Sequence, residues 1–227
     1  MRRHIPNIIT LLNLASGFTA LIFIINGEPV TASWFVAAAM VFDFCDGMAA
    51  RVLKAYSEMG KQLDSLADMV SFGAVPGVLV YSITTAAENE WLRVGVALLL
   101  PLFAALRLAK FNIDEEQKDE FKGLPTPAAA LAIISLILAS HHGSHTAMMI
   151  TGNITVLFIW SAAIAFMMVV PLRMMSLKFR SLGIRENFYR YLLILLSLGA
   201  IIMTGFGGLF LIIPFYILIS LSALVSR

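Results

Sequence analysis

Residues 43–51, DFCDGMAAR, and residues 60–68, GKQLDSLAD, place four aspartates at the ends of two otherwise apolar segments. Asp43 and Asp46 are three residues apart, and Asp64 and Asp68 are four apart, so each pair lies on one face of a helix. A charge near the bilayer centre costs roughly 2.5–3.5 kcal/mol, so such residues are expected to be functional. Carboxylate oxygens are the preferred ligands of Mg²⁺, Mn²⁺ and Ca²⁺. These four carboxylates are therefore predicted to hold divalent metal.

The composition around this stretch is that of an integral membrane protein. Of the 227 residues, 59% are hydrophobic, and the mean hydropathy is +0.88. Soluble domains have only about 45–50% apolar residues. The first apolar run ends without a small-residue cleavage site, so no signal peptide is expected. Cys45 is the single cysteine, which excludes an intramolecular disulfide.

A helix that crosses a bilayer needs about 20 apolar residues. On this measure the chain is predicted to be a single domain, residues 1–227, that folds as an all-α polytopic membrane helix bundle with about eight transmembrane helices. The run from Tyr189 to Ser226 is too long for one span, and the glycines at 205, 207 and 208 supply a turn within it. The predicted spans are Pro6–Asn26, Thr31–Leu53, Gly60–Ala86, Trp91–Phe111, Pro125–His142, Thr146–Leu172, Tyr189–Gly205 and Gly207–Ser226.

The positive charges predict the orientation of these spans. With both termini in the cytoplasm, every lysine and arginine except Arg93 falls on the cytoplasmic side. Such an excess is typical of cytoplasmic loops. The aspartates then lie at the cytoplasmic ends of the second and third spans. We expect an integral protein of the cytoplasmic membrane whose active site faces the cytoplasm.

The aspartate stretch also resembles a known family. Its pattern D-x2-D-G-x2-A-R-x8-G-x3-D-x3-D is that of the CDP-alcohol phosphotransferases, matched at every fixed position. The resemblance implies that a hydroxyl attacks a CDP-activated phosphate and that CMP leaves. It also implies a homodimer. Two metal ions, Mg²⁺ or Mn²⁺, suit this chemistry because they can stabilise both the attacking and the leaving oxygens.

The same resemblance assigns roles to individual residues. Asp68 resembles the family's general base, which takes the proton of the incoming hydroxyl, and it is also a metal ligand. Small residues in the motif would let the nucleotide approach, and the guanidinium of Arg51 can fork onto pyrophosphate oxygens. The residues expected to contact the CDP group are Asn7, Thr10, Gly47, Ala50, Arg51 and Gly60. Without the resemblance, Pro6-Asn7 and Gly60 are explained equally well as residues that begin a helix, with no contact to CDP.

The acceptor alcohol is predicted from two further stretches. Residues 106–112, LRLAKFN, and residues 121–130, FKGLPTPAAA, resemble the phosphatidylserine synthase branch of the family. CDP-diacylglycerol and serine are therefore the expected substrates, with membrane lipid around the chain and no nucleic acid partner. Arg107 is the best candidate for the serine carboxylate, and Lys110 could assist it. The alternative for Arg107 is a snorkelling side chain or a structural ion pair.

Two other functions remain open on the sequence. A related enzyme could use glycerol 3-phosphate or inositol phosphate, but the phosphate of those acceptors would require several converging cations. A divalent-cation transporter could also carry aspartates within the membrane. A transporter has no need of the small residues and the arginine, whereas a nucleotide site requires bare backbone and a phosphate partner.

Overall fold

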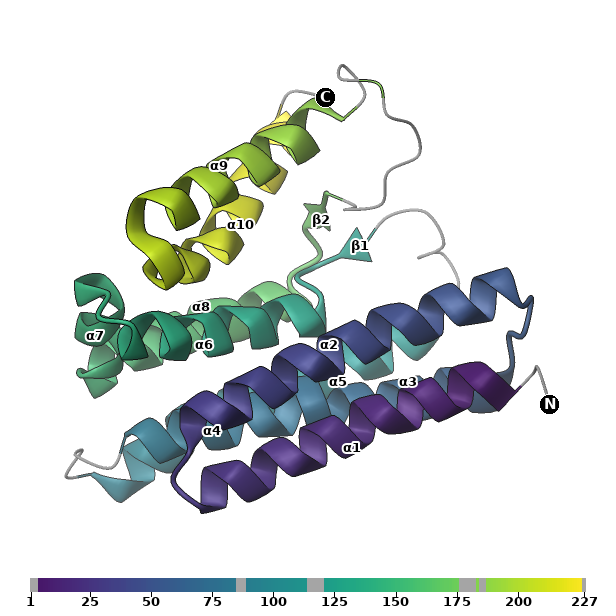
Figure 1. Cartoon of the computed structure of the whole chain (residues 1–227), viewed down its shortest axis with the longest axis horizontal. Helices are drawn as coiled ribbons and strands as arrows, with labels where there is room; N and C mark the ends of the chain where they lie inside the picture. The colour runs from purple at the N-terminus through teal and green to yellow at the C-terminus, as the bar shows by residue number, and fades with distance from the viewer. Residues whose placement is uncertain (1–3, 85–88, 114–120, 176–182, 184–186, 226–227) are drawn as a thin grey trace.

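The computed structural model describes residues 4–84, 89–113, 121–175, 183 and 187–225. Within these residues nearly all regular structure is helical, as Figure 1 shows. The exceptions are β1 (Phe121–Lys122) and β2 (Arg173–Met174), which pair as one short antiparallel ladder. The predicted helical bundle is therefore confirmed.

The first two helices form an antiparallel pair that builds one side of the bundle. They are α1 (Ile5–Ile25) and α2 (Pro29–Val52), and they pack along each other over most of their length. Each has a proline in its first turn, where the missing N–H costs nothing. The turn between them depends on Gly27, whose φ of +78° suits glycine. This pairing brings the start of α1 beside the end of α2, where the motif lies (Figure 1).

The third predicted span is continuous but contains a π-helical turn. It consists of α3 (Glu58–Asp68), the π-helix Met69–Ala74 and α4 (Val75–Ile83). Pro76 has no N–H, and in an α-helix its ring would clash with the carbonyl of Phe72, so regular α-helical bonding is interrupted here. The widened turn follows Asp68 directly, and π-turns are frequent at functional sites.

The central helix of the fold is α6 (Thr126–His141), which is buried along most of its length. It contacts α2, α8 (Ile154–Val169) and the π-helix. The long helix α5 (Glu90–Ile113) packs against α4 and α8. The apolar core accordingly lies between α6 and the helices of the motif.

The predicted span Thr146–Leu172 is not one helix, and this prediction was wrong. The segment is broken into α7 (His145–Thr151) and α8, with Gly152 and Asn153 between them. The Asn153 side chain accepts hydrogen bonds from the amides of Thr155 and Val156, so it caps a new helix rather than continuing the old one. The α7 helix is bent by 116° from α6.

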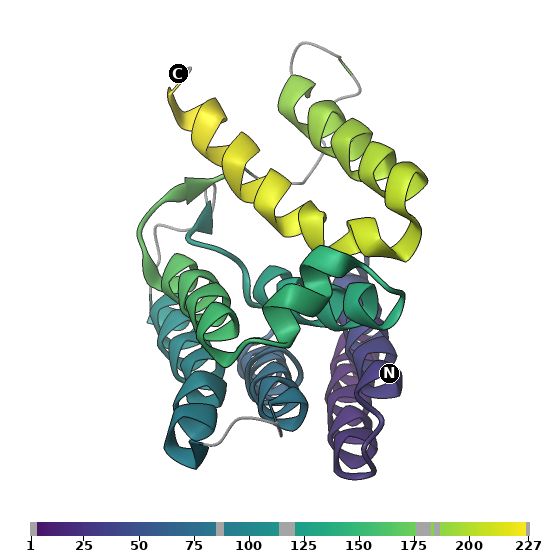
Figure 2. The same ribbon diagram turned by 90° about the vertical axis from the view of Figure 1, so that its left-hand side faces the viewer.

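The last two helices confirm the predicted glycine turn. The segments α9 (Phe188–Thr204) and α10 (Ile212–Val225) are joined by the 3₁₀-helix Gly205–Leu211. Gly205 has a φ of +60°, and α9 contacts α10. Figure 2 shows the two helices folding back on each other over α6 and α7. Most of the exposed side chains of α9 are apolar, as expected of a helix that meets lipid.

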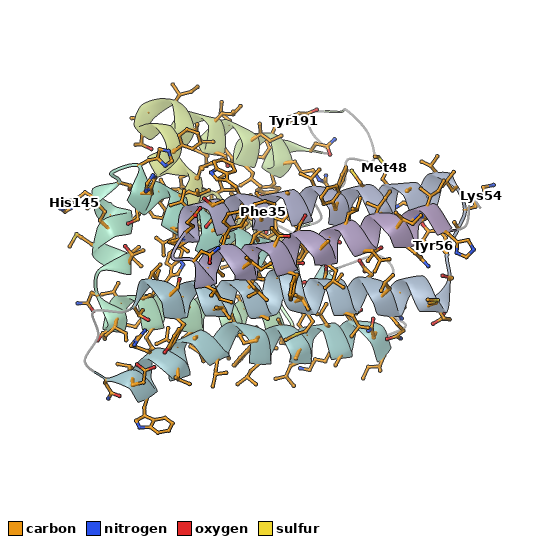
Figure 3. The ribbon with its side chains drawn as sticks, turned by 60° about the horizontal axis from the view of Figure 1, so that its bottom comes forward. Phe35, Met48, Lys54, Tyr56, His145 and Tyr191 are labelled. Carbon is orange, nitrogen blue, oxygen red and sulfur yellow. The ribbon has the colours of Figure 1, made fainter. Side chains whose placement is uncertain are left out.

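Four helical segments of the described chain are long and apolar enough to cross a membrane, or five if α6 and α7 together count as one span. This confirms a membrane helix bundle, while the count of eight spans stays a prediction. Figure 3 shows that Lys54 and Tyr56 lie at one end of the bundle and His145 at the opposite end. The loops predicted between 112–124 and 173–188 lie largely outside the described residues.

Candidate metal and substrate site

Three of the four predicted metal ligands converge on one point. Asp43 of α2 and Asp64 and Asp68 of α3 each offer a carboxylate oxygen, and these oxygens lie within 4.8 Å of one another. Asp68 is buried, whereas Asp43 and Asp64 are half-buried. Three hard oxygen donors from two helices fit a Mg²⁺, Mn²⁺ or Ca²⁺ ion. Without a cation this group of like charges would repel, so the arrangement is compatible with metal binding.

The fourth predicted ligand, Asp46, lies beside this cluster. It is buried, and it interacts electrostatically with Asp64. One of its oxygens accepts a hydrogen bond of 2.6 Å from the hydroxyl of Thr10. Thr10 also donates to the carbonyl of Pro6, at 3.0 Å. The structure thus places Thr10 where it orients an aspartate, a contact that the sequence did not predict.

The other predicted nucleotide-binding residues surround the same end of the bundle. An added Cβ at Gly60 would lie 3.1 Å from Oδ1 of Asn7, so these two predicted residues are neighbours. An added Cβ at Gly47 would meet no described atom within 4 Å, which leaves open space on the α2 face. Ala50 is half-buried on α2, and Arg51 is exposed at its end. Gly47 thus has open space beside it, and the Arg51 cation is exposed at the end of the same helix.

Asp68 has two polar neighbours that the sequence analysis missed. Nδ2 of Asn13 donates to Oδ1 of Asp68, and the Thr126 hydroxyl donates to Oδ2, both at 3.4 Å. Both neighbours are buried. Asn13 could have been found, because it lies three residues after Thr10 on the same face of an apolar helix. Thr126 could not, since only the tertiary fold brings α6 to Asp68.

Arg107, the predicted partner for serine, is buried near the carboxylates. It interacts electrostatically with Asp68 and Tyr216, and its Nη1 donates to the carbonyl of Met168 at 3.1 Å. That carbonyl belongs to the last turn of α8, where the helix leaves carbonyls without internal partners. Lys110 is exposed one turn further along α5. Arg107 therefore takes part in a structural contact with α8 and also lies close to the site.

The chain is similar in sequence to several known proteins. The family model described as CDP-alcohol phosphatidyltransferase matches residues 3–170. Proteins named CDP-diacylglycerol–serine O-phosphatidyltransferase are similar to this chain: that of Bacillus subtilis is 38% identical over 59% of this chain and 75% of its own length. The protein of that name from Helicobacter pylori J99 is 29% identical over 91% of this chain and 87% of its own.

Two further relatives show how far the similarity extends. The archaetidylserine synthase of Methanothermobacter thermautotrophicus is 33% identical over 69% of this chain and 67% of its own length. The serine O-phosphatidyltransferase of Mycobacterium leprae is 38% identical over 59% of this chain. This chain spans about half the length of the mycobacterial relatives it matches, 46% in that case.

Proposed function

Because the chain belongs to the CDP-alcohol phosphatidyltransferase family, we propose that it transfers the phosphatidyl group of CDP-diacylglycerol to the hydroxyl of L-serine. The products are phosphatidylserine and CMP. The observation that carries the proposal is the convergence of the Asp43, Asp64 and Asp68 oxygens within 4.8 Å beside an open face of α2. The choice of serine is supported by relatives named for serine transfer in both bacteria and archaea.

The residues of this site have separable roles in the proposed reaction. The serine oxygen forms a new bond to the phosphatidyl phosphorus, and the bond from that phosphorus to the CMP oxygen breaks. Asp68 accepts the proton of the serine hydroxyl, as a general base must. Arg51 binds pyrophosphate oxygens, while Gly47 and Ala50 leave room for the nucleotide. Asn7, Thr10 and Gly60 line the same end of the bundle.

The carboxylates would hold two divalent ions, Mg²⁺ or Mn²⁺. Asp43, Asp64 and Asp68 supply one group of ligands, and Asp46, close to Asp64, is available to a second ion. Bound cations would offset the negative charge on the transferred phosphate and on the leaving CMP.

An acceptor experiment tests the proposal directly. The purified protein in lipid vesicles receives CDP-diacylglycerol and Mn²⁺ together with L-serine, glycerol 3-phosphate or inositol phosphate, and CMP release is measured. We expect release with serine and background release with the two phosphorylated acceptors. Release with glycerol 3-phosphate instead would assign the chain to a sibling activity, and no release with any acceptor would refute the proposal.

The transporter alternative is tested at Gly47. A leucine there would extend into the open space on α2, where an added Cβ meets no described atom within 4 Å. As an enzyme, the Gly47→Leu variant should lose CDP-diacylglycerol binding while it still binds Mn²⁺. Mn²⁺ uptake into vesicles by the wild-type protein, unaffected by this change, would favour transport.

Arg107 is proposed to bind the carboxylate of serine, assisted by Lys110. A buried guanidinium near Asp68 is a suitable partner for that group. Arg107→Ala should raise the KM for serine strongly, since losing a buried charge-assisted pair costs on the order of 2–5 kcal/mol. CDP-diacylglycerol binding should change little.

Arg93→Ala is the matched control for Arg107→Ala. Arg93 lies at the start of the same helix, where it pairs with Glu90 and lies over the ring of Tyr81. That variant should leave the serine KM unchanged. An unchanged serine KM in Arg107→Ala would show that Arg107 does not bind the serine carboxylate and has a structural role.

The proposed orientation places the carboxylates at the cytoplasmic face of eight spans, with both termini inside. Tyr56 and His145 are exposed at opposite ends of the bundle (Figure 3). In a Cys45→Ser background, Tyr56→Cys should react with a membrane-impermeant thiol reagent only from the cytoplasm, and His145→Cys only from outside.

The homodimer is also proposed, and the mass of the detergent-solubilised protein tests it.

A further inference from the structure

We propose that Asn13 and Thr126 are positioning residues for Asp68, which together fix the direction in which its carboxylate oxygens point. The inference deepens the proposed function and rests on it, because the proton-accepting role of Asp68 belongs to that proposal. Neither residue is part of the aspartate motif. They come from α1 and α6, two helices that approach Asp68 from different parts of the chain.

Each of the two donors bonds to a different oxygen of the Asp68 carboxylate. Asn13 Nδ2 lies 3.4 Å from Oδ1 of Asp68, and Thr126 Oγ1 lies 3.4 Å from Oδ2. One donor on each oxygen fixes the rotation of the carboxylate plane. An ionised carboxylate has about four lone-pair sites. Two of them therefore stay free, enough for a metal ion on one oxygen and the incoming proton on the other.

The backbone of Asn13 is held against the π-helix by a hydrogen bond. Its backbone carbonyl accepts a hydrogen bond of 3.1 Å from the hydroxyl of Ser71 in the π-helix. This approach requires Gly17, because an added Cβ there would lie 2.2 Å from Ser71 Oγ. The π-helix that follows Asp68 thus also carries Ser71, which holds Asn13 on α1 next to the aspartate.

The buried amide of Asn13 lowers the stability of the fold, because one of its polar atoms has no partner among the described atoms. It is 0% exposed, and its Oδ1 has no hydrogen-bond partner among the described atoms. A buried acceptor without a partner is unfavourable, whereas an apolar side chain of similar shape would avoid the penalty. An asparagine here is therefore better explained by its bond to Asp68 than by packing.

Thr126 is brought to Asp68 by the connection that precedes α6. The amide of Gly123 donates to the carbonyl of Leu172, just beyond α8, and the amide of Leu124 donates to that of Met167 in the last turn of α8, both at 2.8 Å. Gly123 has a φ of +79°, and an added Cβ would lie 2.6 Å from the Met168 carbonyl. This attachment places the first residue of α6 against the carboxylate. The positive end of the α6 dipole then also favours the charge of Asp68.

The two bonds to Asp68 are longer than that between Thr10 and Asp46, 3.4 Å against 2.6 Å. Catalytic hydrogen bonds are often long before the substrate binds and shorten in the reactive complex. We therefore expect Asn13 and Thr126 to affect turnover more than substrate binding. Loss of such a supporting partner typically reduces activity or metal affinity by about 10–100-fold.

The test compares Thr126→Val, Thr126→Ser and Asn13→Leu. Thr126→Val should lower kcat about 10-fold or more with little change in the serine KM, and Thr126→Ser should restore it, since the hydroxyl returns. Asn13→Leu should lower kcat similarly while its melting temperature stays equal to or above that of the wild type. A purely structural asparagine would instead lower the melting temperature. The control is Thr84→Val, which removes a buried hydroxyl far from the site.

A double variant separates positioning from general damage. If Thr126 acts through Asp68, then Thr126→Val should have no further effect on kcat in an Asp68→Asn background. Wild-type kcat in both Thr126→Val and Asn13→Leu, or a full additional loss in the double variant, would overturn the inference. A wild-type protein that releases no CMP with serine would refute the proposed function instead. In that case the Mn²⁺ affinity of Thr126→Val and Asn13→Leu tests the inference. An affinity equal to that of the wild type in both variants would contradict it.

Discussion

Asp64→Asn is expected to reduce CMP release by about 10³-fold or more, and Asp43→Asn should do the same. Each side chain gives one of the three oxygens that converge within 4.8 Å. A bound metal ion contributes several kcal/mol to the transition state, and each ~1.4 kcal/mol is a factor of ten in rate. Asparagine keeps the shape of the side chain but loses the charge. The variants should therefore insert and fold normally, and calorimetric titration should show weakened Mn²⁺ binding.

Glu58→Gln is the matched control, because this exposed carboxylate is on the same helix as Asp64 but outside the cluster. It should retain both Mn²⁺ binding and activity. Chelation by EDTA should abolish wild-type turnover, and added Mn²⁺ should restore it. Full activity of the metal-stripped protein would exclude the metal site.

Asp68→Asn should have a different effect from the other two substitutions. If general-base catalysis is the main role of Asp68, kcat should fall by roughly 10²–10⁴-fold. The amide that replaces the carboxylate can still bond to Asn13 or Thr126, so the fold should be preserved. CDP-diacylglycerol affinity should be reduced less than in Asp43→Asn. Single-turnover CMP release together with equilibrium binding of the lipid measures both quantities.

The comparison of Asp68→Asn with Asp43→Asn decides the role of Asp68. A large loss of kcat with nearly normal lipid and metal binding supports a base. If both variants lose lipid and metal binding equally, Asp68 is a ligand only. Its burial at 7% exposure already sets it apart from the half-buried Asp43 and Asp64.

Much of the site could be predicted because its residues are close in the sequence. The spacing of Asp64 and Asp68 on one helix face follows from the helix period alone. The family resemblance then related this pair to Asp43 and Asp46 and to small residues such as Gly47. The structure brings Asp43, Asp64 and Asp68 together, and the role of Gly47 in nucleotide binding stays a prediction.

Three other features of the structure were not predicted, two of them local and one a contact between helices. Hydropathy alone suggested one span for Thr146–Leu172, since a single glycine and asparagine hardly change a window average. The structure breaks the segment there because Asn153 caps a new helix. The π-turn before Pro76 was also missed, as was the bond from Thr10 to Asp46.

The sequence by itself determined that this chain is a membrane helix bundle with a carboxylate site of a known family, because composition and short-range periodicity are local properties. Only the tertiary structure decided which side chains support those carboxylates. Asn13 and Thr126 lie 55 and 58 residues from Asp68 along the chain, yet both contact it. Contacts of this kind depend on how whole helices pack, and on close approaches such as Gly17 to Ser71. No local pattern specifies such packing.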